Sequence, residues 1–138
     1  MRVMVLVKAN EDSEAGVLPD RKLLAEMGEF NQELLKAGVL LAADGLRASS
    51  KGKRVRFAKG EKKVLDGPFA ETKELVAGYW LWQVKSMEEA VEWLKRAPFE
   101  DTEVEIRQVF EVEDFGENMT PDHRERYEDF QRQTRKKA

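Results

Sequence analysis

The alternation of apolar and polar positions predicts strands and helices in turn from the first residues of the chain. Residues 2–8 form an unbroken aliphatic and β-branched run of strand length, which is typical of a central strand covered on both faces. Residues 9–18 are polar and contain glycine, so we expect a loop there. From Pro19 onward apolar residues recur every three or four positions, which predicts a helix that begins at Pro19 or Asp20 and ends at Gly38.

The middle of the chain predicts a short strand followed by a β-hairpin. Residues 39–43 are apolar and precede a turn signal at Asp44-Gly45. Residues 54–57 alternate basic and apolar side chains, and residues 59–62 separate them from the run 63–65. This pattern is typical of two antiparallel strands joined by a tight turn.

Residues 75–84 predict a strand with two apolar faces. The pleat places Tyr79 and Leu81 on one face, and on the other face it places Trp80, Trp82 and Val84. We expect the tryptophans in the core or in an interface. A single domain of this size covers one sheet face with its own helices, so the second apolar face indicates another layer. A second subunit supplies that layer most economically, and we therefore expect a homodimer.

The remaining pattern completes a fold class. Ser86 opens a stretch with capping-box spacing, which predicts a helix that Pro98 ends, and residues 104–112 alternate like a final strand. The order is strand, helix, strand, hairpin, strand, helix, strand. It predicts an α+β fold, namely a ferredoxin-like sandwich with an antiparallel sheet and an inserted β-hairpin.

A change of composition divides the chain. We expect one domain over residues 1–115 and a charged C-terminal helical tail over residues 116–138. Residues 120–122, Thr-Pro-Asp, form a helix-start signal, and the apolar anchors that follow it are Tyr127 and Phe130. The tail is expected to be either docked on a partner subunit or frayed.

Composition narrows the range of chemistry. The 138 residues contain no cysteine, which removes thiolate nucleophiles, disulfides and thiolate-bound metals and fits a reducing cytoplasm. The single histidine, His123, lies in the tail, so neither a Ser-His-Asp triad nor a zinc site is expected. We predict no metal, and any metal would have to be a hard cation such as Mg²⁺ or Ca²⁺ on Asp and Glu oxygens. We also predict no cofactor, since neither a phosphate loop nor a dinucleotide fingerprint occurs.

Charge and hydropathy exclude further classes. The net charge of −3 argues against a nucleic-acid binder. The basic residues around the predicted hairpin are then best explained as protection of strand edges against aggregation rather than as phosphate contacts. No apolar run reaches the length of a signal-peptide core or a membrane span, so we expect no membrane association and a cytoplasmic location.

The densest group of chemical side chains lies in residues 66–74, Asp-Gly-Pro-Phe-Ala-Glu-Thr-Lys-Glu. Asp66 either accepts backbone hydrogen bonds within the turn or acts as a base at the edge of a cleft. The turn itself does not need Glu71 or Lys73, which favours a site. We take these three residues as catalytic candidates, and as ligand-binding candidates we take Lys8, Phe69, Glu74 and Tyr79.

Three of the other polar residues have a simpler alternative. Lys8 at the end of the first strand either lines the same cleft or is merely solvated, and Glu14 in the following loop has the same two readings. Asp44 before Gly45 is interpreted as a turn former.

The Asp66-Gly67-Pro68-Phe69 motif, its Ala-Glu-Thr-Lys-Glu sequel and Gly78-Tyr79 resemble the DGPF family of YCII-related proteins. The likeness runs from Met1 to about Glu113 and leaves the tail uncovered. It implies a dimeric α+β barrel, in which two ferredoxin-like sheets pack face to face. The wider YCII group has a proposed His-Asp active site, but His123 lies outside the likeness, so a mechanism that depends on histidine does not carry over.

Two functions follow as hypotheses. The first is a homodimeric module, binding or enzymatic, that uses carboxylate acid–base chemistry on a small polar molecule in a cleft near the dimer interface. The alternative is a regulatory protein that acts with a protein partner. The resemblance suggests a sigma factor of the extracytoplasmic-function type, because some relatives are encoded beside one.

Overall fold

The computed structural model describes residues 1–136 of the chain. The chain divides into two compact units, Met1–Gln108 and Val109–Ala138. The first unit contains the predicted sheet, its helices and the hairpin. The second contains the C-terminal helix. Each unit is described by itself.

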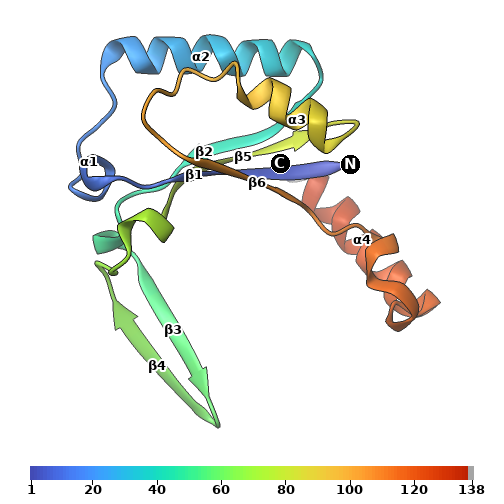
Figure 1. Cartoon of the computed structure of the whole chain (residues 1–138). Helices are drawn as coiled ribbons and strands as arrows, with labels where there is room; N and C mark the ends of the chain where they lie inside the picture. The colour runs from blue at the N-terminus through green and yellow to red at the C-terminus, as the bar shows by residue number, and fades with distance from the viewer. Residues whose placement is uncertain (137–138) are drawn as a thin grey trace. The chain divides into compact units, whose positions relative to one another are not determined.

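The first unit is built on an antiparallel four-stranded sheet in the order β2-β5-β1-β6. The strands are β1 (Arg2–Lys8), β2 (Leu40–Gly45), β5 (Val76–Gln83) and β6 (Val104–Gln108). β1 lies between β5 and β6, as its apolar run predicted. Two helices lie on one side of this sheet (Figure 1), and the predicted ferredoxin-like α+β fold is confirmed.

The two covering helices begin and end at polar or glycine signals. α2 (Arg21–Lys36) begins after Asp20, whose side chain accepts a hydrogen bond from the Leu23 N–H at 2.8 Å. Gly38 ends it in the left-handed region, at φ 74°. α3 (Met87–Leu94) begins after Ser86, whose hydroxyl caps the Glu89 N–H at 3.1 Å. α3 is shorter than predicted, because irregular turns and not helix connect it to Pro98.

The core lies between the helices and the sheet. Val3 and Val5 of β1 are fully buried, and Trp80 and Trp82 of β5 are buried beside them. Phe30 of α2 packs edge-on against both tryptophans, at ring-centroid distances of 5.8 and 6.3 Å. The prediction that these tryptophans are packing residues is confirmed.

The opposite face of the sheet is also apolar at its centre. Met4 and Leu6 of β1 pair with Leu81 and Tyr79 of β5, and all four side chains are half-buried. α2 and α3 both lie on the other side of the sheet (Figure 1). The predicted two-faced strand is therefore present, and we call this surface the open face.

The inserted hairpin consists of β3 (Lys53–Ala58) and β4 (Glu61–Asp66), which pair only with each other. It extends away from the four-stranded sheet (Figure 1). Short 3₁₀ turns flank it, η1 (Ser49–Lys51) before it and η2 (Thr72–Glu74) after it.

Two expectations for the first unit were wrong. The segment expected as a loop at residues 9–18 contains a four-residue helix, α1 (Glu11–Glu14), because Asn10 and Ser13 form a capping box. The expected turn at Asp44-Gly45 is the end of β2, where both residues pair with β5. Pairing with a neighbouring strand outweighs the local turn preference at these two residues.

The second unit contains η3 (Val112–Asn118) and α4 (Pro121–Lys136). The predicted tail helix is present, but the last strand is shorter than expected. β6 ends at Gln108, and Val112 lies in η3, where the Glu111 N–H donates to the Asp114 carboxylate at 2.8 Å. This cap starts a helical turn although the apolar alternation continues to Val112.

Candidate functional site

The turn formed by Asp66, Gly67, Pro68 and Phe69, here called the DGPF turn, is bound to η1. The Gly67 N–H donates to the carbonyl of Gly52 at 3.0 Å, and the Phe69 N–H donates to Ser49 Oγ at 3.0 Å. A Cβ atom added at Gly67 would lie 1.7 Å from the Ser49 carbonyl oxygen. Only glycine fits this close approach of two backbones.

Ser49 joins the DGPF turn to the N-terminal part of the chain. Its backbone N–H donates to the Glu14 carboxylate at 2.9 Å, and its hydroxyl donates to the other oxygen of the same carboxylate. The hydroxyl oxygen therefore accepts from Phe69 while its proton goes to Glu14. Glu14, Ser49 and Phe69 form one hydrogen-bonded chain across 55 residues of sequence.

The two bonds from Ser49 act on the ionisation of Glu14. The hydrogen bond from the Ser49 hydroxyl, and then that from its backbone N–H, lower the pKa of Glu14 below its usual value of 4.5. Both bonds favour the charged form of the carboxylate. Glu14 is therefore a fixed anion near neutral pH.

A cleft of about 740 Å³ opens beside this hydrogen-bonded chain. Its lining includes Glu14 and residues 15–19, here called the α1 loop. It also includes Arg47 and Lys51, from the segment that leads from β2 into η1. Within residues 1–136, neither Arg47 nor Lys51 is engaged by an ion pair. Apolar residues complete the lining, among them Val17, Leu46, Ala48 and Ala77.

The structure separates Asp66 from this cleft. Its carboxylate pairs with Lys53 Nζ at the base of the hairpin, and its side chain is 75% exposed. Phe69 is half-buried, with the guanidinium of Arg54 3.9 Å from its ring centroid. Both contacts hold the base of the hairpin against the turn.

The other charged residues of the motif lie in solvent. Glu71 is exposed and adopts a left-handed backbone at φ 63°, and its carbonyl accepts from the Glu74 N–H at 2.8 Å. Lys73 and Glu74 belong to η2 and are exposed as well. No ion pair within residues 1–136 joins these three side chains to each other or to Asp66.

Lys8 and Tyr79 belong to the open face of the sheet. Lys8 is largely buried and pairs with Glu105 of β6 at 3.3 Å. The Tyr79 hydroxyl donates to the Asp44 carboxylate of β2 at 3.1 Å. This hydrogen bond, and then the charge of Asp44, raise the pKa of Tyr79 above its usual value of 10.0. Asp44 thus serves as a hydrogen-bond partner within the sheet.

Sequence reasoning missed most of the cleft. Glu14 was considered, but Ser49 was not, and Lys51 was assigned to the hairpin's basic group. The available signal was weak, because a serine in an irregular connection has no periodic neighbours. The pairing of Ser49 with Glu14 spans 35 residues and depends on the tertiary fold.

Within residues 1–136, no group of three or more acidic or histidine side chains is arranged to hold a metal ion. In the same part of the chain, every helix is too short or too polar to cross a membrane.

Comparison with known proteins agrees with the motif. An uncharacterized protein of Rhizobium meliloti (strain 1021) is 30% identical over 76 residues, which are 55% of this chain and 61% of the relative. The aligned part is thus less than two thirds of that relative's length. The family described as YCII-related domain matches residues 1–113, which include the sheet, the hairpin, the DGPF turn and the cleft. The chain belongs to the family of proteins with a YCII-related domain.

Proposed function

We propose that this protein is a homodimeric binding module, acting in the cytoplasm, that holds a small anionic molecule in the cleft between the α1 loop and η1. One observation carries the proposal. Arg47 and Lys51 line the same cleft of about 740 Å³ as Glu14, and neither cation has an ion-pair partner within residues 1–136. A volume of this size accepts a small metabolite.

The chemistry of the lining defines the ligand class. The two cations on one wall suit a carboxylate or phosphate group. The apolar side chains of Val17, Leu46 and Ala48 suit a short hydrocarbon portion. Glu14, which also lines the cleft, suits a hydroxyl or ammonium group, since a carboxylate held ionised accepts hydrogen bonds.

The open face supports the dimer. Met4, Leu6, Tyr79 and Leu81 form an apolar centre that α2 and α3 do not cover. Charged side chains surround this centre, among them Lys8 and Glu105. Ala77, which lines the cleft, lies two residues before Tyr79 in β5, so the cleft lies next to one end of the open face. A second subunit packed on the open face would therefore border the cleft.

Binding is better supported than acid–base catalysis. A general base exchanges a proton readily, whereas the two bonds from Ser49 hold Glu14 as a carboxylate. The exposed side chains of Asp66, Glu71 and Lys73 need a cover that excludes water before they can serve as catalytic groups. A catalytic role for these three residues thus depends on the second subunit.

Native mass spectrometry of the gently purified protein tests the proposal, because it reports subunit number and retained small molecules together. We expect a dimer that carries an additional small mass. The double variant Arg47→Ala/Lys51→Ala should be a dimer without that mass. Its matched control, Arg21→Ala/Lys36→Ala, removes one arginine and one lysine from α2 and should still carry the additional small mass.

A clean dimer from the unmodified protein calls for a second measurement. In a thermal shift assay, small carboxylates or phosphate esters should then raise the unfolding temperature of the protein and of the control variant. They should leave the unfolding temperature of the Arg47→Ala/Lys51→Ala variant unchanged. Equal shifts for both variants would refute the cleft as the binding site. A monomeric mass for the unmodified protein would refute the proposed homodimer.

A further inference from the structure

The hairpin exposes an apolar face that the rest of the first unit leaves uncovered. Residues 53, 55 and 57 of β3 lie on the same face as their β4 partners 66, 64 and 62. Three of these side chains are apolar and exposed, namely Val55, Phe57 and Val64 with 48%, 73% and 59% of their surface accessible. We call residues 53–66 the arm.

An arm of this kind has little stability of its own. A two-stranded hairpin without further strands is marginally stable in water. β3 and β4 pair only with each other, and at their base the DGPF turn is bonded to Ser49 and Gly52. The exposed apolar face therefore indicates a partner that covers it.

The charge of the arm restricts that partner. Residues 53–66 contain six Lys or Arg and two Asp or Glu, although the whole chain has a net charge of −3. A complementary surface must be acidic and must offer apolar side chains for Phe57.

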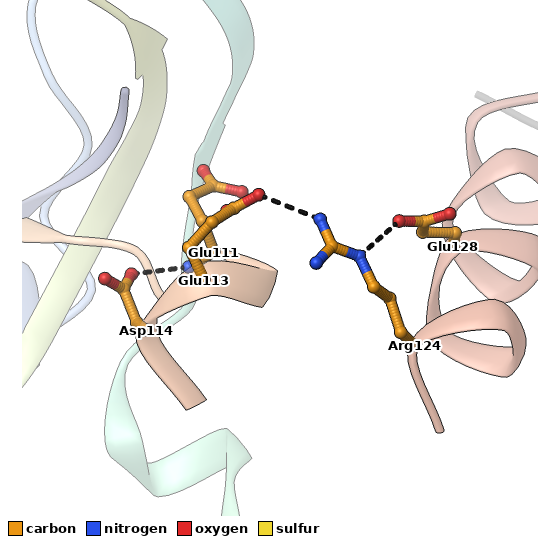
Figure 2. Close-up of polar contacts among 5 residues, drawn as sticks. All are labelled: Glu111, Glu113, Asp114, Arg124 and Glu128. Carbon is orange, nitrogen blue, oxygen red and sulfur yellow. Dashed lines mark hydrogen bonds and ion pairs between the residues drawn. The ribbon is translucent and has the colours of Figure 1, made fainter. Parts of the chain in front are cut away.

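The second unit of the chain has such a surface. Residues 109–129 contain eight Asp or Glu and two Arg. Figure 2 shows one of these arginines, Arg124, shared between Glu113 at 3.3 Å and Glu128 at 3.1 Å, so the acidic excess is only partly neutralised. We call residues 109–129 the acidic surface.

Aromatic side chains lie exposed among these acids. The rings of Phe110 and Phe115 stack at a centroid distance of 5.1 Å, and the two residues are 62% and 40% exposed. The ring of Tyr127 meets Phe115 edge-on at 6.0 Å. A groove of about 420 Å³ lies along Phe115, Met119 and Tyr127.

We infer that the arm of one copy docks on the acidic surface of a second copy. The apolar face of the arm packs against the exposed phenylalanines, and its lysines and arginines lie among the carboxylates. The arm offers cations and the acidic surface offers carboxylates, and each carries exposed apolar side chains. The inference rests on the proposed homodimer but not on the proposed ligand.

Photo-cross-linking tests this contact in the full-length chain. The probe is p-benzoylphenylalanine in place of Phe57, which keeps an aromatic side chain at an exposed position. The modified protein is mixed with isotope-labelled protein of unmodified sequence, the subunits are exchanged, and the sample is irradiated. We expect unlabelled arm peptides joined to labelled peptides from residues 109–129. The same probe in place of Leu24, which is 58% exposed on α2, should give no such product.

Charge gives an independent check of the same contact. The variant Lys59→Glu/Lys62→Glu changes the hairpin tip and the partner of Phe57 on the apolar face, and it should lower the cross-link yield about tenfold. Raising the salt to about 1 M should lower the yield as well. The matched variant Arg21→Glu/Lys36→Glu makes the same charge change on α2 and should leave the yield unchanged.

Three results would overturn the inference. They are cross-links found only within one copy, cross-links to parts of a second copy outside residues 109–129, and arm peptides cross-linked to co-purified nucleic acid. Native mass spectrometry of the same samples counts the subunits. A dimer without the expected cross-link therefore refutes the arm contact and leaves the proposed function standing.

Discussion

The hydroxyl oxygen of Ser49 accepts a hydrogen bond from the backbone N–H of Phe69 at 3.0 Å. The same hydroxyl donates to Glu14, so one side chain connects the DGPF turn to the cleft wall. Because the motif's own charged side chains point into solvent, this backbone contact is the motif's clearest link to the cleft. It gives the first prediction.

Replacing Ser49 with alanine should destabilise the protein and loosen the DGPF turn. The Phe69 N–H is part-buried and would lose its acceptor, which costs about 1 kcal/mol of unfolding free energy. Urea unfolding measures this loss. Ser50→Ala removes an exposed hydroxyl from the next residue and should change the unfolding free energy by less than about 0.5 kcal/mol. Equal effects of the two changes would contradict the structural role of Ser49.

The ionisation of Glu14 predicts a dependence of stability on pH. The pKa of Glu14 in the folded protein is lowered below 4.5 by the bonds from Ser49. A lowered folded-state pKa contributes stability that is present above the unfolded-state value and is lost as the pH falls through the folded-state value. The stability advantage of the unmodified protein over Glu14→Gln should therefore be full at neutral pH and shrink below pH 4.5.

Urea unfolding of both proteins across this pH range measures that advantage. Glu11→Gln serves as the control, because Glu11 lies exposed in the same short helix. The free energy of unfolding of Glu11→Gln should differ little from that of the unmodified protein across the whole pH range. An advantage over Glu14→Gln that persists unchanged at low pH would show that the carboxylate does not act through its charge.

Gly67 should tolerate no side chain. The Cβ of an alanine at this position would lie 1.7 Å from the Ser49 carbonyl oxygen, so the two backbones must separate. Forced repacking of this kind costs about 1–3 kcal/mol, and the turn should shift as well. Gly28→Ala is the matched control, because a Cβ there meets nothing within 4 Å and alanine favours the helix by about 1 kcal/mol. The midpoint temperature of thermal unfolding should fall for Gly67→Ala and rise for Gly28→Ala.

The elements with periodic or capped sequences could be predicted. The apolar run of β1, the helical spacing of α2 and the two-faced pattern of β5 each follow from side-chain burial, which sequence order displays directly. The helix start at Asp20 and its end at Gly38 follow from local hydrogen bonding and backbone freedom.

The cleft could not be predicted in the same way. Glu14 comes from the short helix α1, Ser49 from the 3₁₀ turn η1 and Phe69 from the DGPF turn, and no short-range rule pairs them. The charged residues of the motif drew attention in the sequence, yet its glycine and one backbone N–H make the contact with η1. The motif's backbone can thus determine its contact with η1 while its charged side chains lie in solvent.

Tyr79 should titrate above the ordinary range of tyrosine. Its hydroxyl donates to Asp44 at 3.1 Å, and this bond and then the aspartate charge raise the pKa of Tyr79 above 10.0. Ultraviolet absorbance of tyrosinate measures the pKa in a Tyr127→Phe background, which leaves Tyr79 as the only tyrosine. In that background Asp44→Ala removes the bond and the charge and should return the pKa to its usual value.

Asp44→Asn should give an intermediate pKa, because the amide oxygen still accepts the hydrogen bond but has lost the charge. The raised pKa also fixes the sign of a stability effect. A raised folded-state pKa contributes stability that is fully present below pH 10.0 and is lost as the pH rises through the folded-state value. The difference in urea midpoint between the Tyr127→Phe protein and its Asp44→Ala derivative should therefore narrow in strong alkali. The same pKa in all three proteins would show that Asp44 and Tyr79 do not interact in solution.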